Sequence, residues 1–132
     1  MDCLFCRIQK AEHKKEIICE NDFFFVIRDN YPVSKYHTLI IPHRHIQSYF
    51  EINKKEIVSV NQILNFQRDE ILKLDPTVSA FNIGVNDGKD AGQSIYHLHL
   101  HLIPRRYGDM ENPRGGVRGV IPAKQKYEKN FK

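Results

Sequence analysis

Three histidines alternate with apolar residues in the segment YHLHLHLIP, at His97, His99 and His101. Successive side chains of a strand point to opposite faces, so the three imidazoles are expected on one face and Tyr96 with the leucines on the core face. Imidazole exchanges protons, attacks electrophiles and binds metals near neutral pH. Because a flat strand spaces three ligands poorly around one ion, the pattern favours divided roles over a three-histidine metal site or a merely solvent-facing strand.

Two cysteines near the start of the sequence, Cys3 and Cys6, have the Cys-x-x-Cys spacing of metal ligands. The sequence contains no second motif of this kind, so the other ligands of such a site would be histidines. A redox pair is the alternative, although the motif does not follow a strand as it does in thioredoxin-like proteins. The chain has three cysteines, an odd number, and MDCLFCRIQK lacks the apolar stretch of a secretion signal, so we expect reduced thiols and a cytoplasmic location.

A polar loop, NDGKDAGQS at residues 86–94, precedes the histidine segment. Its two glycines allow backbone N–H groups to approach an anion closely, and Asn86, Gln93 and Ser94 add neutral hydrogen-bonding groups. A plain surface turn is the alternative, and no Walker-type phosphate loop is present. A loop of donors that leads into a row of histidines is a plausible seat for phosphoryl chemistry.

The charge balance is mild. Lys and Arg number 20 against 16 Asp and Glu, and the net charge of +4 would suit an anionic ligand without identifying one. Part of the excess lies in the C-terminal tail, where it is either solvated or in contact with phosphate. Nucleic-acid binders usually have denser basic patches interleaved with aromatic residues, so no nucleic-acid partner is expected. The longest apolar run, residues 23–27, is far shorter than the roughly 20 residues of a membrane span.

The remaining patterns predict the elements that position these motifs. Branched and aromatic residues predict strands at residues 23–29, 38–41, 78–85 and 95–103. Asn53 and Glu56 form a variant of the capping box, and apolar residues then recur at helical spacing as far as Asp75-Pro76, which predicts one long helix. We expect a helical turn at residues 6–11 and an irregular C-terminal arm from about residue 105. Together these elements predict one α+β domain over residues 1–132.

The combination of motifs resembles the histidine triad (HIT) superfamily. HLHLHLI at 97–103 matches the His-φ-His-φ-His-φ-φ signature, in which φ is apolar, and three further segments are similar to HIT proteins: CLFC at 3–6, RDNYPVSKYHTLIIPHRH at 28–45, and GVNDGKDAGQSIYHLHLHLIPR at 84–105. The tail GDMENPRGGVRGVIPAKQKY looks like that of bacterial diadenosine-polyphosphate hydrolases. The resemblance implies a HIT-like fold, an antiparallel sheet of about five strands with one long helix and a short N-terminal helix, and a homodimer formed through the long helix and a sheet edge.

The resemblance also implies a mechanism. His99 would attack the α-phosphate of a nucleoside phosphoramidate or dinucleoside polyphosphate, and water would release a nucleoside monophosphate from the covalent nucleotidyl-histidine. His101 would hydrogen-bond the phosphate and the leaving group. The other implied roles are support by His37, phosphate binding by Ser94, Gln93 and Asn86, ribose binding by Asp29, and a purine pocket walled by Phe5, Ile8, Ile18 and Ile27. Ile27 replaces an aromatic residue of some relatives.

The same resemblance implies a structural zinc ion held by Cys3, Cys6, His45 and His97. A divalent metal would accompany a polyphosphate substrate. His43 takes the usual place of lysine in the family segment IPKxH, and His13 is expected to be a surface residue. Two other functions stay open: a nucleotidyl transferase or phosphorylase that uses the same intermediate, and a nucleotide-binding regulatory protein.

Overall fold

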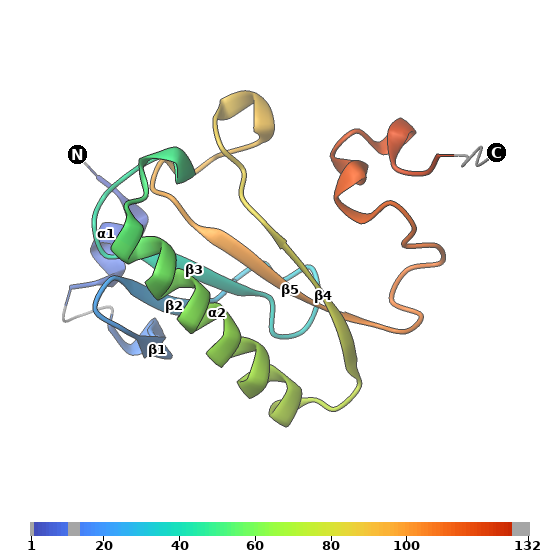
Figure 1. Cartoon of the computed structure of the whole chain (residues 1–132), viewed down its shortest axis with the longest axis horizontal. Coiled ribbons are helices and arrows are strands. Elements are labelled where there is room, and N and C mark those ends of the chain that lie inside the picture. The colour runs from blue at the N-terminus through green and yellow to red at the C-terminus, as the bar shows by residue number, and fades with distance from the viewer. Residues whose placement is uncertain (1, 11–13, 128–132) are drawn as a thin grey trace.

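The structure, a computed structural model, describes residues 2–10 and 14–127. Its helices are α1 (Leu4–Ile8) and α2 (Lys54–Leu74), and its strands are β1 (Cys19–Glu20), β2 (Phe24–Arg28), β3 (Thr38–Pro42), β4 (Val78–Gly84) and β5 (Leu100–Arg106). Every strand pair is antiparallel, and the strands lie in the order β1-β2-β3-β5-β4 (Figure 1). The predicted HIT-like α+β fold is therefore confirmed.

The sheet is buried on both faces at its centre. Phe24 and Val26 of β2 pack with Val60 and Ile63 of α2, which lies across one face of the sheet (Figure 1). The intervening residues of β2 point to the other face, where they form a second buried cluster with α1: Cys3, Phe5, Ile8, Phe25, Ile27, Leu39 and Ile41. This two-sided burial explains why residues 23–27 are continuously apolar rather than alternating.

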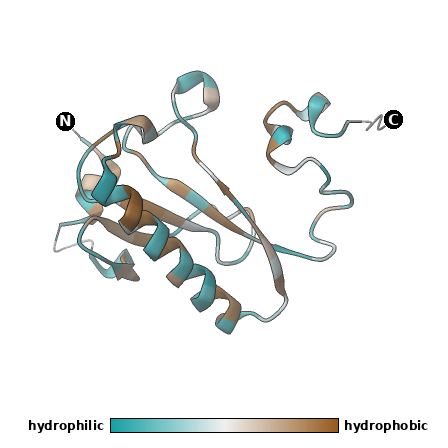
Figure 2. Cartoon of the chain, viewed as in Figure 1, coloured by the Kyte–Doolittle hydropathy of each residue, from teal (hydrophilic) through white to brown (hydrophobic). Residues whose placement is uncertain are grey.

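Helix α2 begins as its sequence predicts. The Asn53 side chain accepts a hydrogen bond from the Glu56 N–H (2.9 Å), and the Glu56 carboxylate accepts one from the Asn53 N–H (3.0 Å). The helix ends at the residue before Asp75, whose neighbour Pro76 is unsuited to a further turn. Apolar and polar residues alternate along it in Figure 2, with the apolar stripe covering the sheet. Among the described residues, no helix combines the length and apolarity needed to cross a membrane.

The last strand begins five residues later than the predicted start at residue 95. The backbone N–H of Leu98 donates to the carbonyl of Ile46 (2.6 Å), beyond the end of β3, and regular pairing starts only where Leu100 faces Ile40. Tyr96 is consequently 46% exposed instead of lying on the core face. The leucines that follow it, Leu98, Leu100 and Leu102, are buried as the alternation predicts.

Two other predicted boundaries also shift. Strand β5 continues through Arg106, which pairs with Val78 of β4. The C-terminal arm therefore begins after residue 105, where it was predicted to start. The N-terminal helix spans Leu4–Ile8, so it begins and ends ahead of the predicted helical turn; its first hydrogen bond runs from the Arg7 N–H to the carbonyl of the extended residue Cys3 (2.9 Å). Ala11, at the end of that predicted turn, and His13 lie outside the described residues. The short strand β1 was not predicted, since two residues carry no periodicity.

Candidate active site and metal centre

The four residues expected to bind zinc lie together between α1, the end of β3 and the entry to β5. The Nδ1 atom of His97 lies 3.4 Å from Cys3 Sγ, 3.6 Å from Cys6 Sγ and 3.1 Å from His45 Nδ1. His45 Nδ1 lies 3.2 Å from Cys6 Sγ. Ligand atoms of a tetrahedral zinc ion are about 3.3–3.8 Å apart, as follows from the usual Zn–N and Zn–S bond lengths. The donor set and its spacing therefore fit a closed Cys₂His₂ zinc site.

The ring of His97 is oriented for such a role. Its Nε2 lies 2.8 Å from the carbonyl oxygen of Pro42, and because a carbonyl only accepts, Nε2 carries the ring hydrogen. Nδ1 therefore presents its lone pair to the two cysteines and His45. Burial is the main reason that the pKa of His97 falls to about 4, so the ring is neutral near pH 7, as a metal ligand must be.

An ion pair between a half-exposed arginine and a buried carboxylate fixes the segment that carries His45. The guanidinium of Arg44 donates to the Glu56 carboxylate at 2.8 Å, and Glu56 is only 2% exposed. Glu56 thus closes the capping box of α2 and at the same time anchors the residue beside a candidate metal ligand. The hydrogen bond from Arg44 is the main cause that holds the pKa of Glu56 below its usual value. Sequence reasoning found the cap but not the ion pair, since no local pattern joins residues 12 positions apart.

His99 lies next to the predicted zinc ligands, and one of its two ring nitrogens is engaged in a hydrogen bond. Its Nδ1 lies 2.9 Å from the carbonyl oxygen of His97, so Nδ1 carries the hydrogen and Nε2 keeps its lone pair. Phe5 of α1 packs edge-on against the imidazole, with ring centroids 5.0 Å apart. Burial lowers the pKa of His99 below its ordinary value, which keeps the ring neutral. The arrangement offers an unprotonated nitrogen in a fixed orientation.

His101 and His37 form a hydrogen-bonded pair with a defined direction. The Val33 N–H donates to His37 Nδ1 (3.1 Å), which leaves the hydrogen of His37 on Nε2. That N–H faces His101 Nδ1 at 2.9 Å and the Asp29 carboxylate at 3.5 Å. The hydrogen of His101 is therefore on Nε2, a buried atom with no hydrogen-bond partner among the described residues. An unsatisfied buried donor costs about 1–3 kcal/mol, which indicates a binding partner such as a ligand oxygen.

The rings of the pair are neutral. Burial is the first cause that lowers the pKa of His101 to about 4 and of His37 below its ordinary value. The carboxylate of Asp29 and one ring nitrogen of each histidine also lie within 4.8 Å of one another, a grouping that a divalent cation could use. The hydrogen bonds account for this grouping without an ion. His97 and His101 thus belong to two different clusters and His99 to neither, which agrees with the expectation of divided roles.

The polar loop is held by its own side chains. The Gln93 amide donates to the carbonyls of Gln47 (3.0 Å) and Ile95 (3.2 Å), and its oxygen accepts from the Gly88 N–H (2.9 Å). Both of its N–H groups are thereby committed to protein, so phosphate binding by Gln93 stays a prediction. Asp87, which sequence reasoning missed, accepts from the Ser48 hydroxyl and the Tyr49 N–H at 3.0 and 2.9 Å and ties the loop to the segment before α2.

The two remaining polar residues of the loop lie in different places. Asn86 lines a cavity of about 360 Å³ together with His37 and His101. Ser94 lines a separate hollow of about 310 Å³ together with Arg7. This hollow lies beside the predicted zinc ligands and includes His45 in its lining. Their predicted contacts with phosphate oxygens stay predictions.

The residues expected to wall a purine pocket are largely brought together. Phe5, Ile8 and Ile27 are nearly fully buried in the cluster under α1. Ile18 is 47% exposed and lies outside that cluster. His43 has a structural place here: its Nε2 donates to the Asn21 carbonyl at 3.0 Å, and its ring stacks on Phe25.

Known proteins share this architecture. The HIT domain family matches residues 10–108. The adenylylsulfatase HINT3 of Arabidopsis thaliana is 35% identical over 108 residues, which are 82% of this chain and 54% of that protein. A zinc-bound histidine triad family protein from Mycobacterium smegmatis superposes with a TM-score of 0.75 at 30% identity, over 85% of this chain and 81% of that one. The diadenosine triphosphate hydrolase of Plasmodium falciparum gives 0.69 at 27% identity, over 84% and 75%.

The family match and the fold agree with the motif. The matched residues include all five strands, the long helix and all three alternating histidines. The family includes hydrolases, as the Arabidopsis and Plasmodium proteins show by their activities. This chain belongs to the HIT family.

Proposed function

We propose that the protein is a nucleotide hydrolase that acts on the α-phosphate of a nucleoside phosphoramidate or a dinucleoside polyphosphate. The observation that carries the proposal is the fixed tautomer of His99, whose Nδ1–H donates to the His97 carbonyl and leaves Nε2 as a nucleophile. The HINT3 relative is an adenylylsulfatase and the Plasmodium neighbour a diadenosine triphosphate hydrolase, so cleavage at a nucleotide phosphate also has precedent in the family.

In the first step, the lone pair of His99 Nε2 forms a bond to phosphorus, and the bond from phosphorus to the leaving atom breaks with its electron pair. The leaving group accepts a hydrogen bond from His101 Nε2, the unpartnered donor of the site, and takes its proton from a water molecule. The His97 carbonyl, hydrogen-bonded to Nδ1, stabilises the positive charge that develops on His99. In the second step, water attacks phosphorus, the N–P bond breaks with its electrons returning to Nε2, and the proton that water loses neutralises the hydroxide formed in the first step.

The other predicted residues complete this proposal. His37 would hold the tautomer of His101, Asn86 and Ser94 would bind phosphate oxygens, and Asp29 would bind the ribose. Gln93 would support the loop. The purine would lie against Phe5, Ile8, Ile18 and Ile27.

The experiment is a substrate panel with mass detection of the intermediate. Adenosine 5′-phosphoramidate and diadenosine tetraphosphate are each mixed with the protein, quenched in acid and followed by product analysis and intact mass. We expect AMP as the product and one nucleotidyl group on wild-type protein, with a loss of at least about 10³-fold in kcat/KM and no adduct for His99→Ala. Unchanged hydrolysis by His99→Ala contradicts the nucleophile. Nucleoside diphosphate formed in phosphate buffer indicates a phosphorylase, and binding without turnover indicates a regulatory protein.

We also propose a structural zinc ion at Cys3, Cys6, His45 and His97, supported by the spacing of these ligands and by the zinc-bound Mycobacterium neighbour. All three cysteines are free thiols, which fits a reducing, cytoplasmic location.

A homodimer through α2 and the edge strand β4 is a further part of the proposal. β4 lies at one end of the sheet and α2 exposes apolar side chains, among them Val58 (60%) and Phe66 (51%). Light scattering should give twice the chain mass for wild-type protein and one chain mass for Phe66→Asp. A monomeric wild type at micromolar concentration contradicts the dimer.

A further inference from the structure

The backbone of Tyr36 has a conformation that is unusual for a residue with a side chain. Its φ is 73°, and no other non-glycine residue within 2–10 and 14–127 has a positive φ. A Cβ atom disfavours this left-handed region, which glycine adopts freely. Such a conformation persists only where the surrounding structure holds it, and residues of this kind cluster at functional sites. Tyr36 directly precedes His37 of the candidate active site.

The conformation of Tyr36 reverses the chain at the entry to β3. The His37 N–H donates to the Ser34 carbonyl at 3.0 Å, which closes a four-residue turn with Tyr36 at its third position. A positive φ at this position is characteristic of type II turns, where glycine is usual. Beyond the turn, the His37 carbonyl accepts from the Asp29 N–H (2.8 Å) and its Nδ1 accepts from the Val33 N–H (3.1 Å). The direction of the His37 ring therefore depends on the left-handed residue before it.

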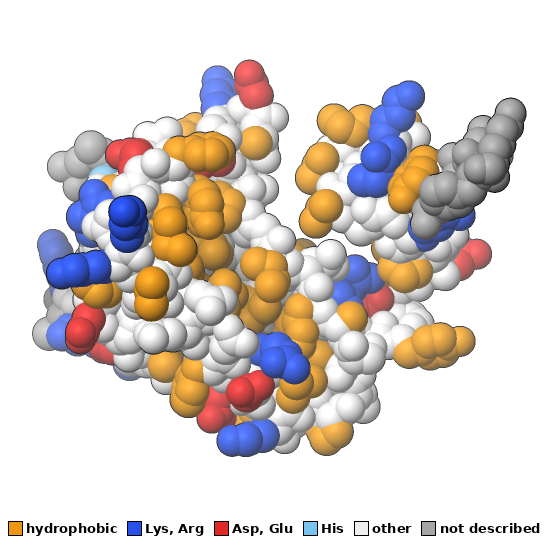
Figure 3. All heavy atoms as spheres, in the orientation of Figure 1, with side chains coloured by type: hydrophobic (Ala, Val, Ile, Leu, Met, Phe, Trp, Pro, Cys, Tyr) orange, Lys and Arg blue, Asp and Glu red, His pale blue; other side chains and the backbone are white. Residues whose placement is uncertain are grey.

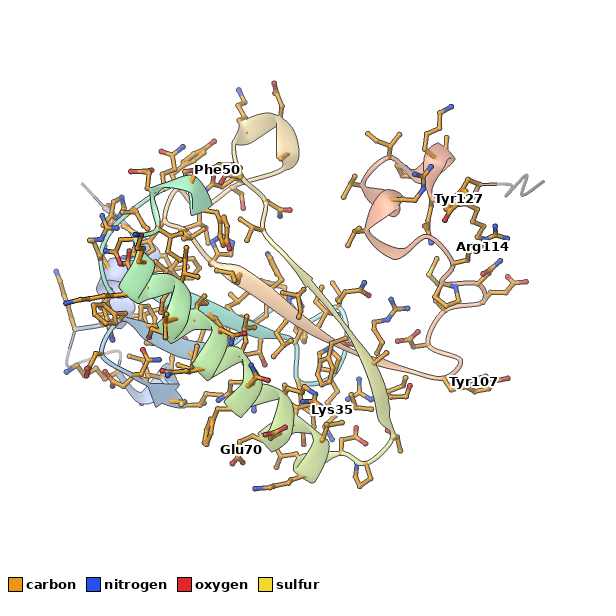
Figure 4. The ribbon with its side chains drawn as sticks, viewed as in Figure 1. Lys35, Phe50, Glu70, Tyr107, Arg114 and Tyr127 are labelled. Carbon is orange, nitrogen blue, oxygen red and sulfur yellow. The ribbon has the colours of Figure 1, made fainter. Side chains whose placement is uncertain are left out.

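Two hydrogen bonds tie this turn to β5. The Ser34 hydroxyl donates to the Pro104 carbonyl at 2.7 Å, and the guanidinium of Arg106 donates to the Lys35 carbonyl at 3.0 Å. Lys35, labelled in Figure 4, marks the position of the turn in the ribbon. Because His101 belongs to the same strand, these bonds fix the turn relative to the second histidine of the hydrogen-bonded pair.

The side chain of Tyr36 packs on the side of the sheet that α2 covers. It lies against the buried cluster of Ile71, Val78 and Leu102, the first of which belongs to α2. The side chain is half-buried, so this packing stabilises the conformation of its backbone. Figure 3 shows the same end of the molecule at its surface, where charged side chains lie among hydrophobic ones near the end of α2. The anchor of Tyr36 is thus separate from the candidate active site.

Two cations also lie over the Tyr36 ring. The Lys35 ammonium and the Arg28 guanidinium are 5.2 and 5.5 Å from its centroid, within the range of cation–π interactions. Arg28 is held in turn, since its guanidinium donates to the Thr38 hydroxyl (2.6 Å) and to the Gln67 side-chain oxygen (3.1 Å). Gln67 belongs to α2 and is only 2% exposed, so this acceptor is fixed by burial. Packing and charge together offset the cost of the left-handed backbone.

We propose that Tyr36 is a positioning residue for hydrolysis, whose anchored left-handed backbone sets the direction of the His37 ring and thereby the tautomer of His101. The inference rests on the proposed hydrolase function and adds to it a residue that contacts no reacting atom. The Nε2–H of His37 faces His101 Nδ1 at 2.9 Å, and a rotated His37 ring would release this nitrogen. The hydrogen of His101 would then be shared between its two nitrogens, and part of the protein would lack the Nε2–H donor.

The test replaces Tyr36 by residues that differ in their tolerance of a positive φ. Glycine tolerates it best, alanine less and β-branched valine least, and none of the three keeps the aromatic anchor. With adenosine 5′-phosphoramidate as substrate, we expect kcat to decrease in the order Tyr36→Gly, Tyr36→Ala, Tyr36→Val. The glycine variant should be within about threefold of wild type and the valine variant at least about tenfold below it, with little change in KM. A side chain that only fills space predicts the reverse order.

A spectroscopic measurement separates positioning from a general loosening of the fold. The ¹⁵N chemical shifts of the imidazoles near pH 7 report which ring nitrogen carries the hydrogen. Wild type and Tyr36→Gly should show the hydrogen of His101 on Nε2, and Tyr36→Val should show a mixture of both tautomers. Ile71→Val is the matched control, because it trims the cluster beneath Tyr36 and leaves the turn unchanged. It should lower the melting temperature but keep the wild-type kcat and shifts.

Three results would overturn the positioning role: the highest kcat of the three variants for Tyr36→Val, a single wild-type tautomer of His101 in that variant, or an equal change of the shifts in Ile71→Val. If Tyr36→Val does not fold, the order of Tyr36→Gly and Tyr36→Ala decides in the same way. Failure of the hydrolase proposal looks different, because wild-type protein would then not turn over the compound, whereas the ¹⁵N shifts would still report the tautomers.

Discussion

The Nδ1 atom of His99 lies 2.9 Å from the carbonyl oxygen of His97, a residue whose own ring belongs to a different cluster. The backbone of the candidate zinc ligand thus fixes the tautomer of the candidate nucleophile. The alternating motif makes this possible, because the ring of His99 can reach back to the backbone carbonyl of the histidine two residues earlier. The predicted zinc ligands and the candidate nucleophile are therefore linked through the backbone.

The first prediction concerns the pH dependence of hydrolysis. The nucleophile must be unprotonated, and the pKa of His99 lies below its ordinary value because the ring is buried. As pH falls, kcat/KM should stay constant through the ordinary histidine range and decline only below it. The measurement is kcat/KM for adenosine 5′-phosphoramidate between pH 4 and 8 in a constant-ionic-strength buffer. An acidic limb with its midpoint at or above about 6.5 would contradict the neutral ring.

The second prediction concerns metal content. Purified protein should contain one zinc ion per chain by elemental analysis, and Cys6→Ser should lose it. Because metal binding is coupled to folding, Cys6→Ser should lower the melting temperature by roughly 10 °C or more. Cys19→Ser is the matched control, since Cys19 is a free cysteine outside the cluster, and it should retain the metal. Zinc well below one ion per chain, or equal melting temperatures for the two variants, would argue against the site.

Features that depend on residues close together in the sequence could be predicted, whereas features that depend on distant residues could not. The Asn53–Glu56 cap and the alternation of Leu98, Leu100 and Leu102 are local, and both are confirmed. The start of β5 is not local: it depends on where Ile40 can pair, and the predicted strand was too long at its beginning.

Contacts between residues distant in the sequence also account for the features of the candidate site that were not predicted. The alternating histidines, the cysteine pair and the loop residues were predicted from their pattern and the other site residues from the resemblance, and the structure brings most of them together. The committed amide of Gln93 and the place of Val117 and Val120 in the lining of the cavity beside His101 had no signal, because a side chain's partners and the return path of an irregular arm follow from tertiary packing.

The third prediction contrasts two capping boxes. Ser48 with Glu51 caps a short exposed turn, whereas Asn53 with Glu56 caps α2, and the nearly fully buried Glu56 carboxylate also holds the guanidinium of Arg44. Glu56→Gln should therefore cost about 2–3 kcal/mol of unfolding free energy, since it weakens a buried charged hydrogen bond, and Glu51→Gln should cost under about 1 kcal/mol. Urea unfolding followed by circular dichroism measures both. Similar losses in the two variants would show that Arg44 adds nothing to the cap.

The fourth prediction concerns the position of the arm. Gly115 has φ 92°, and a Cβ atom there would collide with the Gln125 backbone, so Gly115→Ala should displace the turn that carries Val117 and Val120. Gly108 also has positive φ, 81°, but open space around it, which makes Gly108→Ala a control for backbone strain alone.

Because the arm packs on the domain mainly through its contact with β4, neither variant should shift the main melting transition by more than a few degrees. Gly115→Ala should speed cleavage of the arm by trypsin, measured as the rate of loss of intact protein, and Gly108→Ala should speed it less. Equal cleavage rates in the two variants would mean that the collision with Gln125 is not what positions this turn. A large fall in melting temperature for Gly115→Ala would instead make the arm part of the cooperative core.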